Sequence, residues 1–187
     1  MLVKNIPESL IYEISDGKPI YYKGYQDVLN KTKTLEDIMG CSSLQALIIS
    51  CILEYLYKNI PSHYKIFTNE VGLQIQKGMR RACDIVLFDK EQLKDYTYND
   101  KLFSIPPKIV IEVDIKADME EFVSPLDYYF KKTEELLQFG VEKLIWITTD
   151  SQKITLAAPA QDWIIKNWNA DIEILPGLTT NVQGLVA

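Results

Sequence analysis

Apart from Val110, apolar and polar residues alternate along residues 109–116. The odd positions are all isoleucine or valine, whereas the even positions include two acids and one lysine: Glu112, Asp114 and Lys116. β-Branched residues at every second position predict a buried strand, and the alternation places the three charged side chains on one face of it. Charged groups are costly to bury unless they are paired or hold a metal. The pattern therefore fits either an edge strand with one wet face or a metal-dependent hydrolytic site.

The elements before this strand are a helix and a hairpin. Apolar residues over 43–59 follow the 3.6-residue period, a serine precedes them and Pro61 follows, so we expect a long helix that packs on the core. Residues 66–76 and 81–88 read as strands joined by a turn at 77–80. Asp84 lies in the second of these strands, where a lone acid is unfavourable by propensity, so it too needs a partner.

The elements after this strand form a crossover. Ser124 and Pro125 begin a helix that Gly140 ends, and residues 141–149 are a second apolar strand. A strand, helix and strand at this spacing predict a parallel pair. Further short strands are expected at 154–157 and within 163–174, residues 89–107 read as an exposed excursion, and the tail from residue 175 reads as irregular. The pattern predicts an α/β fold with a mixed β-sheet flanked by helices.

Length and composition limit the function classes. With 187 residues, one domain over residues 1–187 is expected, with 1–40 as an N-terminal extension and 41–187 as the core. No apolar run reaches membrane-spanning length, so we expect no membrane partner. Residues 1–7 lack the apolar region of a secretory signal, and the three cysteines have neither disulfide nor zinc spacing. We therefore expect a cytoplasmic protein. The single histidine, His63, excludes a histidine-rich metal site, and the net charge of −6 argues mildly against avid nucleic-acid binding without excluding it.

The charged residues fit the chemistry of phosphodiester hydrolysis. Asp84 and Glu112 on neighbouring strands would supply the hard oxygen ligands that Mg²⁺ prefers. A bound metal lowers the pKa of water, and a nearby lysine can orient that water or stabilise charge on the phosphate. Scattered acids are common in α/β sheets, so the order of the elements is a stronger indication than the spacing.

At this point the chain resembles the Uma-type family of restriction-endonuclease-like proteins, a domain-of-unknown-function family abundant in cyanobacteria, within the PD-(D/E)XK nuclease-like superfamily. The resemblance runs from about Ser43 to the end and is vague over the first forty residues. The residues that carry it are Asp84-Ile85-Val86, Pro106-Pro107 before Ile111-Glu112-Val113, Lys132 eight residues before Gly140-Val141, the stretch 142–150, and Leu175-Pro176-Gly177-Leu178. It implies a Mg²⁺-dependent endonuclease that acts on DNA, with Mn²⁺ as a substitute ion.

The chain departs from the family pattern at the lysine. The position two residues after Glu112 carries Asp114, which leaves two registers: Glu112 is the motif acid with the lysine displaced to Lys116, or Asp114 and Lys116 form the motif themselves. The resemblance makes Lys132 a second candidate, because the lysine can migrate to a neighbouring helix. It also makes Glu70, which matches an acidic position of the family, a candidate extra metal ligand.

Three basic residues near the hairpin turn, Lys77, Arg80 and Arg81, are candidate phosphate contacts, although an ordinary solvated turn fits them equally well.

A homodimer is expected, because one metal site per chain cuts both strands of a duplex most simply with two-fold symmetry. The alternative function is a catalytically degenerate member of the fold that binds nucleic acid or a protein without cleavage.

Overall fold

The computed structural model describes residues 6–120, 122 and 124–187. The argument against a secretory signal rests largely on residues 1–5, which lie outside the described residues. The elements in chain order are η1 (Glu8–Leu10), β1 (Ile11–Ser15), β2 (Lys18–Tyr21), α1 (Tyr25–Leu29), α2 (Leu35–Met39), α3 (Ser43–Asn59), β3 (Tyr64–Gln76), β4 (Met79–Asp89), η2 (Lys90–Leu93), β5 (Ile109–Val113), α4 (Pro125–Phe139), β6 (Lys143–Thr148), β7 (Lys153–Ala157), β8 (Ile164–Asn167), β9 (Ile172–Leu175), β10 (Leu178–Thr180) and α5 (Val182–Leu185).

Within the described residues, eight strands form one mixed sheet in the order β2-β1-β4-β5-β6-β7-β8, with β3 paired to β4. The β3–β4 and β4–β5 pairs are antiparallel, whereas β5 and β6 are parallel and connected by α4. The predicted hairpin and the predicted crossover are therefore both present. The segment that the sequence pattern treats as an extension contributes β1 and β2 to the same sheet.

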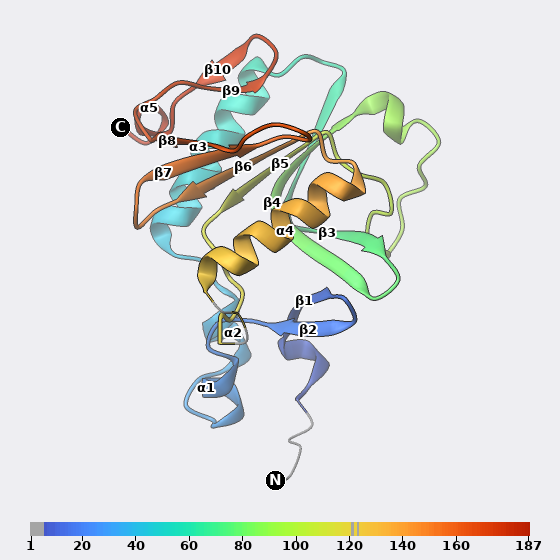
Figure 1. The fold of residues 1–187 in the computed structure, drawn as a ribbon, viewed down its shortest axis with the longest axis vertical. Helices are drawn as coiled ribbons and strands as arrows, with labels where there is room; N and C mark the ends of the chain where they lie inside the picture. Colours follow the sequence, from blue (N-terminus) through green and yellow to red (C-terminus); the bar gives the residue numbers. More distant parts are fainter. Residues whose placement is uncertain (1–5, 121, 123) are drawn as a thin grey trace.

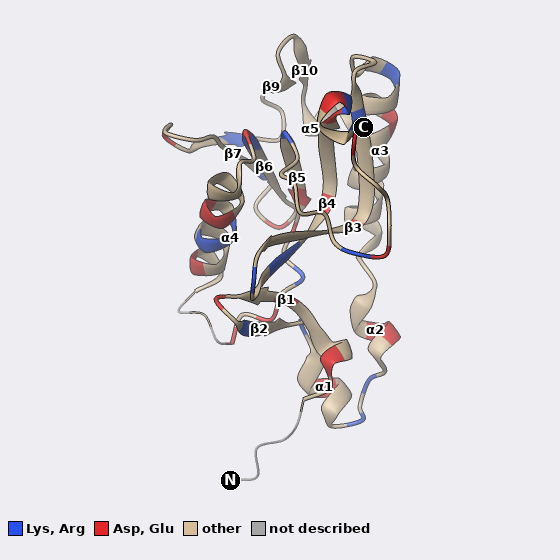
Figure 2. Ribbon diagram, turned by 90° about the vertical axis from the view of Figure 1, so that its right-hand side faces the viewer, with Lys and Arg blue, Asp and Glu red and all other residues tan. Residues whose placement is uncertain are grey.

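The two long helices cover opposite faces of the sheet, as Figures 1 and 2 show. One apolar cluster joins α3 to one face through Ile48, Ile52 and Leu56, and a second cluster joins α4 to the other face through Tyr128, Tyr129 and Leu136. Because β-strands present alternate side chains to opposite faces, each central strand contributes to both clusters. No helix in the described ranges is long and apolar enough to cross a membrane.

The helix α3 follows the prediction closely. Ser42 caps its N-terminus by accepting a hydrogen bond from the backbone N–H of Gln45, and the helix ends at Asn59 before Pro61. Its buried face is narrower than the sequence suggests, because Leu44 and Leu47 are exposed.

The C-terminal tail differs from the expectation of an irregular segment. From Leu175 onward the chain ends β9, turns at Gly177 with a positive φ of 78°, returns as β10 and continues into α5. Leu178 and Val182 join the apolar cluster under α3. The short elements are stabilised by this packing, which a local sequence pattern does not reveal.

The strand β4 changes partner along one of its edges. It pairs with β3 over its length, whereas its other edge pairs with β1 at Arg80 and with β5 from Ile85 to Leu87. Between these two contacts, no strand of the described chain pairs with residues 81–84 on that edge. The sheet therefore contains a gap in its ladder, and the candidate functional residues lie around it.

Candidate active site

The strand β5 is shorter than the alternation predicts, because it ends at Val113. Asp114 has a φ of 60°, which turns the chain out of the strand. Its carboxylate accepts hydrogen bonds from the backbone N–H and the hydroxyl of Thr149, both at 2.7 Å. The prediction that Asp114 shares a face with Glu112 and Lys116 is therefore wrong, and its contacts tie the end of β5 to the turn after β6.

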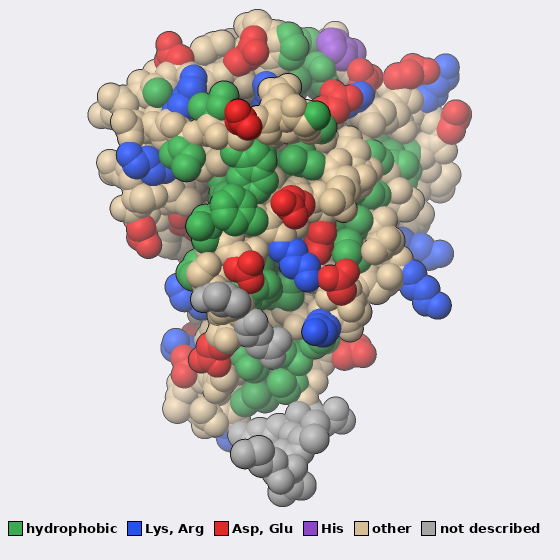
Figure 3. Space-filling model, viewed as in Figure 1, with side chains coloured by type: hydrophobic (Ala, Val, Ile, Leu, Met, Phe, Trp, Pro, Cys, Tyr) green, Lys and Arg blue, Asp and Glu red, His purple; other side chains and the backbone are tan. Residues whose placement is uncertain are grey.

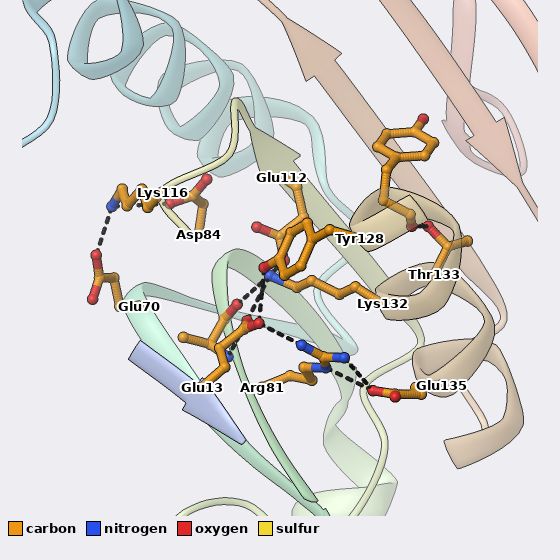
Figure 4. A network of polar contacts seen from close by, with 12 residues as sticks. Glu13, Glu70, Arg81, Asp84, Glu112, Lys116, Tyr128, Lys132, Thr133 and Glu135 are labelled. Atoms are coloured by element: carbon orange, nitrogen blue, oxygen red, sulfur yellow. Dashed lines mark hydrogen bonds and ion pairs between the residues drawn. The ribbon is translucent and has the colours of Figure 1, made fainter. Parts of the chain in front are cut away.

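Asp84 and Glu112 lie at the same end of the β4–β5 ladder. Each is one residue beyond the Ile85–Ile111 pair, and the charge of Asp84 acts on Glu112. The two side chains are 6% and 2% exposed. Asp84 Oδ2 accepts a hydrogen bond of 2.8 Å from the backbone N–H of Val113, and Figure 4 shows both carboxyl groups at this end of β5. The sheet thus brings together the two acids that the sequence proposes as metal ligands.

The end of β5 is also held from the other face of the sheet. Gln45, in the first turn of α3, is buried, and its Nε2 donates a hydrogen bond of 2.7 Å to the carbonyl of Val113. The backbone that carries Glu112 is therefore fixed through both the N–H and the C=O of the next residue. The sequence gives no local sign of this role, because the helix pattern treats Gln45 as a polar position beside the cap.

Lys132 projects from the middle of α4 to Glu112. Its Nζ lies 3.0 Å from Glu112 Oε1 and 2.9 Å from Glu13 Oε1, and it donates a hydrogen bond of 2.7 Å to the carbonyl of Ala82. The residue is only 1% exposed. Burial alone would lower the pKa of Lys132, but the charges of Glu112 and Glu13 outweigh it and raise that pKa well above its usual value. Lys132 is therefore a fixed cation inside the fold.

Lys116 lies on the other side of the site, beside Asp84. Because β5 ends early, the loop returns Lys116 so that its Nζ is 3.5 Å from Asp84 Oδ1, and it donates a hydrogen bond of 2.6 Å to Glu70 Oε1. The loop is held next to β2, where Tyr22 and Ala117 form an isolated bridge. The Lys116 side chain is 17% exposed, so it borders solvent.

Glu70 reaches Lys116 through an irregularity in β3. The register with β4 shifts between Thr68 and Val71, and the two intervening residues, Asn69 and Glu70, both have positive φ, at 81° and 52°. Such bulges re-aim side chains and recur beside functional sites. The carboxylate of Glu70 also accepts a hydrogen bond from Tyr22 Oη at 3.4 Å. Glu70, proposed from the sequence as an extra metal ligand, is thus placed as the counter-ion of Lys116.

Glu13, on β1, is another site residue that sequence reasoning missed. It is fully buried, and its carboxylate accepts hydrogen bonds from Arg81 Nη1 at 2.6 Å, from Tyr128 Oη at 2.8 Å and from the backbone N–H of Ala82 at 3.1 Å. Burial alone would raise the pKa of Glu13, but Lys132 and Arg81 lower it below its usual value. A signal was available, since Glu13 stands in a short apolar stretch, as Asp84 does.

Arg81 is placed differently from the prediction of a phosphate contact. It is 1% exposed and binds Glu13 and Glu135, with Nε donating to Glu135 Oε2 at 2.7 Å. Glu135 also accepts a hydrogen bond from the Ser15 hydroxyl. All of these partners are protein groups of the interior, so Arg81 is not available to a phosphate at the surface. Lys77 is exposed at the hairpin turn, and Arg80 is partly exposed.

The linked groups carry a net negative charge when all are ionised. Five carboxylates, namely Glu13, Glu70, Asp84, Glu112 and Glu135, face three cations, namely Arg81, Lys116 and Lys132, which leaves a charge of −2. Burial raises the pKa of Glu112 to about 7, with Lys132 opposing the rise and Asp84 adding to it. Although Lys132 Nζ forms an ion pair with Glu112 Oε1, this oxygen accepts no well-directed hydrogen bond from the described residues. One divalent cation would balance this charge.

The donor chemistry fits Mg²⁺, although the protein supplies only part of a coordination shell. Asp84 and Glu112 offer carboxylate oxygens, the ligands that Mg²⁺ prefers. Over the described ranges, no three His, Cys, Asp or Glu side chains are grouped so that they could hold a metal ion. An ion held by Asp84 and Glu112 would therefore complete its shell with water or backbone oxygens, as Mg²⁺ commonly does.

The fold has a relative among solved structures. A crystal structure of a protein from Anabaena variabilis ATCC 29413, described as a "putative nuclease belonging to DUF820", is similar with a TM-score of 0.68 at 16% sequence identity, covering 93% of this chain and 88% of that chain. No family model matches the chain, and no curated protein matches it. The predicted fold class, an α/β mixed sheet flanked by helices as in nuclease-like proteins, is confirmed. Membership of the Uma-type family stays a prediction.

The raised pKa of Glu112 predicts a pH-dependent stability. Because the folded protein holds this proton up to about pH 7 and the unfolded chain releases it near 4.5, the contribution of Glu112 to the free energy of unfolding falls as the pH rises through that window, by at most about 3 kcal/mol. We expect Glu112→Gln to become more stable relative to the parent between about pH 5 and about pH 8 in urea denaturation. The exposed Glu134→Gln on α4 is the control, and a Glu112→Gln difference that stays constant with pH would contradict the prediction.

Proposed function

We propose that this protein is a metal-dependent endonuclease that hydrolyses DNA phosphodiester bonds, with Asp84 and Glu112 as the metal ligands and Mg²⁺ as the ion, for which Mn²⁺ can substitute. The observation that carries the proposal is the pair of buried carboxylates at the end of the β4–β5 ladder, each with its own lysine. Buried carboxylates are costly unless they are paired or hold a metal, and ionisable groups with shifted pKa values cluster at functional sites. The similar fold of the Anabaena protein described as a putative nuclease supports the same conclusion.

Different residues of the chain have different proposed roles around the phosphate. When bound, Mg²⁺ lowers the pKa of a water molecule and neutralises charge on the phosphate. Asp84 and Glu112 are pre-oriented for such an ion, because the backbone N–H of Val113 holds Asp84 and the ammonium of Lys132 holds Glu112. Pre-orientation removes the reorganisation that the reaction would otherwise require.

We assign the role of contacting the substrate to Lys116. It borders solvent and already lies beside Asp84, so breaking its pair with Glu70 would free its ammonium for a phosphate oxygen or the attacking water. The ammonium of Lys132 is buried and already surrounded by Glu13, Glu112 and the carbonyl of Ala82. Lys132 therefore holds Glu112 rather than the substrate.

Substitutions at the site should separate these roles. Asp84→Asn or Glu112→Gln should abolish metal-dependent cleavage, and Lys116→Met should lower the single-turnover rate on duplex DNA by about 10²–10³-fold while the protein stays folded. Lys58→Met is the control, because Lys58 pairs with Glu54 at the exposed surface of α3, on the other face of the sheet. Parent rates in both Lys116→Met and Lys132→Met would show that the site is wrong.

The DNA backbone is proposed to lie along the tips of two hairpins. The backbone N–H of Gly17 donates to the carbonyl of Gly78 at 2.8 Å, so the β1–β2 turn lies beside the β3–β4 turn. Lys18, Lys77 and Arg80 belong to these tips, and Figure 3 shows basic side chains at the edge of the molecule over the end of the β3–β4 hairpin. Basic side chains at these tips would favour phosphate contact despite the net charge of −6.

A double substitution tests this surface. Lys77→Ala with Arg80→Ala should weaken DNA binding uniformly across sequences and lower the slope of log K against log salt by about 2, since each lost phosphate contact removes about 1. Binding is measured by fluorescence anisotropy at several salt concentrations in an Asp84→Asn background, which prevents cleavage. Lys101→Ala, an exposed lysine before β5, is the control, and an unchanged slope would contradict the proposal.

The homodimer is a proposal that follows from the function. One metal site per chain cuts both strands of a duplex most directly when two copies bind with two-fold symmetry. Light scattering at micromolar concentration, with and without duplex DNA, should give a protein mass of twice 21.5 kDa once the mass of any bound DNA is subtracted. A 21.5 kDa species under both conditions would contradict it.

The alternative function is binding without cleavage. The position two residues after Glu112 carries Asp114, which contacts Thr149, and the lysine is displaced to Lys116; this departure from the family pattern favours the alternative. Under it, neither Mg²⁺ nor Mn²⁺ would support cleavage by the parent protein, whereas DNA or a protein partner would still bind.

A further inference from the structure

The gap in the ladder of β4 is closed by side chains rather than by a strand. On the edge where neither β1 nor β5 pairs with it, the backbone N–H of Ala82 donates to Glu13 Oε1, and the carbonyl of Ala82 accepts from Lys132 Nζ. Glu13 Oε1 and Lys132 Nζ are themselves 2.9 Å apart. Backbone groups that lack a strand partner bond to side chains instead. Here the N–H and C=O of Ala82 contact both members of the buried ion pair, Glu13 and Lys132.

The other oxygen of Glu13 is held equally firmly. Glu13 Oε2 accepts hydrogen bonds from Arg81 Nη1 at 2.6 Å and from Tyr128 Oη at 2.8 Å. The carboxylate therefore has four donors around it and no solvent contact, which leaves it little freedom to move. Lys132 has the opposite arrangement, since it is a long side chain whose ammonium is located by what it binds.

We propose that Glu13 is a positioning residue of the site, which holds the ammonium of Lys132 in place against Glu112. Lys132 Nζ is shared between Glu13 Oε1 at 2.9 Å and Glu112 Oε1 at 3.0 Å. With Glu13 present, Lys132 is only partly neutralised by Glu112, so the carboxylate of Glu112 keeps capacity for a divalent cation. Without the charge of Glu13, Lys132 pairs with Glu112 alone and competes with the metal for it.

This inference makes the N-terminal strand β1 part of the site rather than an extension of the fold. It rests on the proposed function, because it takes Glu112 as a metal ligand. Residues that hold a metal ligand from outside the coordination shell typically change metal affinity by 10-fold to 100-fold when they are replaced.

The test is the affinity for Mn²⁺, measured by isothermal titration calorimetry on the full chain without DNA. Glu13→Gln, which keeps the shape of the side chain and removes its charge, should weaken Mn²⁺ binding by about 10-fold or more. Glu135→Gln is the matched control, because it removes the same charge from the same network but contacts Arg81 and Ser15 instead of Lys132. It should bind Mn²⁺ nearly as the parent does.

A second pair of variants shows whether Glu13 acts through Lys132. In a Lys132→Met background, adding Glu13→Gln should leave Mn²⁺ affinity unchanged, since the coupling between contacting residues is lost with either one. The double variant also removes both buried charges together, so it remains informative if Glu13→Gln alone does not fold.

The outcomes separate this inference from the proposed function. If the parent protein binds no Mn²⁺, the proposed metal site itself fails. If the parent binds Mn²⁺ and Glu13→Gln binds it equally well, or if Glu13→Gln and Glu135→Gln weaken it to the same extent, the positioning role is overturned. An equal loss in both variants would mean that only the total charge of the network matters.

Discussion

The ammonium of Lys132 is the charge on which this structure depends. It is enclosed by Glu13 from β1, Glu112 from β5 and the carbonyl of Ala82 from β4, and it reaches them from α4 on one face of the sheet. Removing a single partner from a buried ion pair typically costs about 3–5 kcal/mol, because the remaining charge is left unpaired. The elements β1, β4, β5 and α4, which are distant in the sequence, are therefore joined at the ammonium of Lys132. This connection makes the site rigid.

The place of this charge follows from the topology of β4. A strand that pairs with β1 at one end and with β5 at the other leaves its middle without a partner on that edge. Side chains that enter the gap meet backbone donors and acceptors, which is why acids and lysines can be buried there. Three of the non-glycine residues with positive φ lie around the same point: Asn69 and Glu70 in the bulge of β3, and Asp114 at the end of β5. Backbone strain of this kind recurs at functional sites.

Local patterns predicted most elements but not the contacts that complete the site. The alternation in 109–116 predicted β5, and the spacing predicted its parallel partner, because both signals come from neighbouring residues. The same alternation placed Ile115 and Lys116 in the strand, whereas the hydrogen bonds of Asp114 to Thr149 end it at Val113. Turn chemistry placed Arg81 at the surface, but its partners, Glu13 and Glu135, lie 68 and 54 residues away. Glu13 was missed for the same reason, since its role depends on a pairing between β1 and β4 that no local period encodes.

The central claim is that Asp84 and Glu112 together hold one divalent cation. The most direct measurement is a crystal structure of the protein soaked in Mn²⁺, with the ion located from its anomalous signal. The account predicts one Mn²⁺ bonded to a carboxylate oxygen of Asp84 and to one of Glu112, at about the 2.1 Å typical of such hard cations, with Lys132 still bound to Glu13. A Mn²⁺ ion that binds neither acid, or one that binds elsewhere while Lys132 and Lys116 keep both carboxylates, would contradict it.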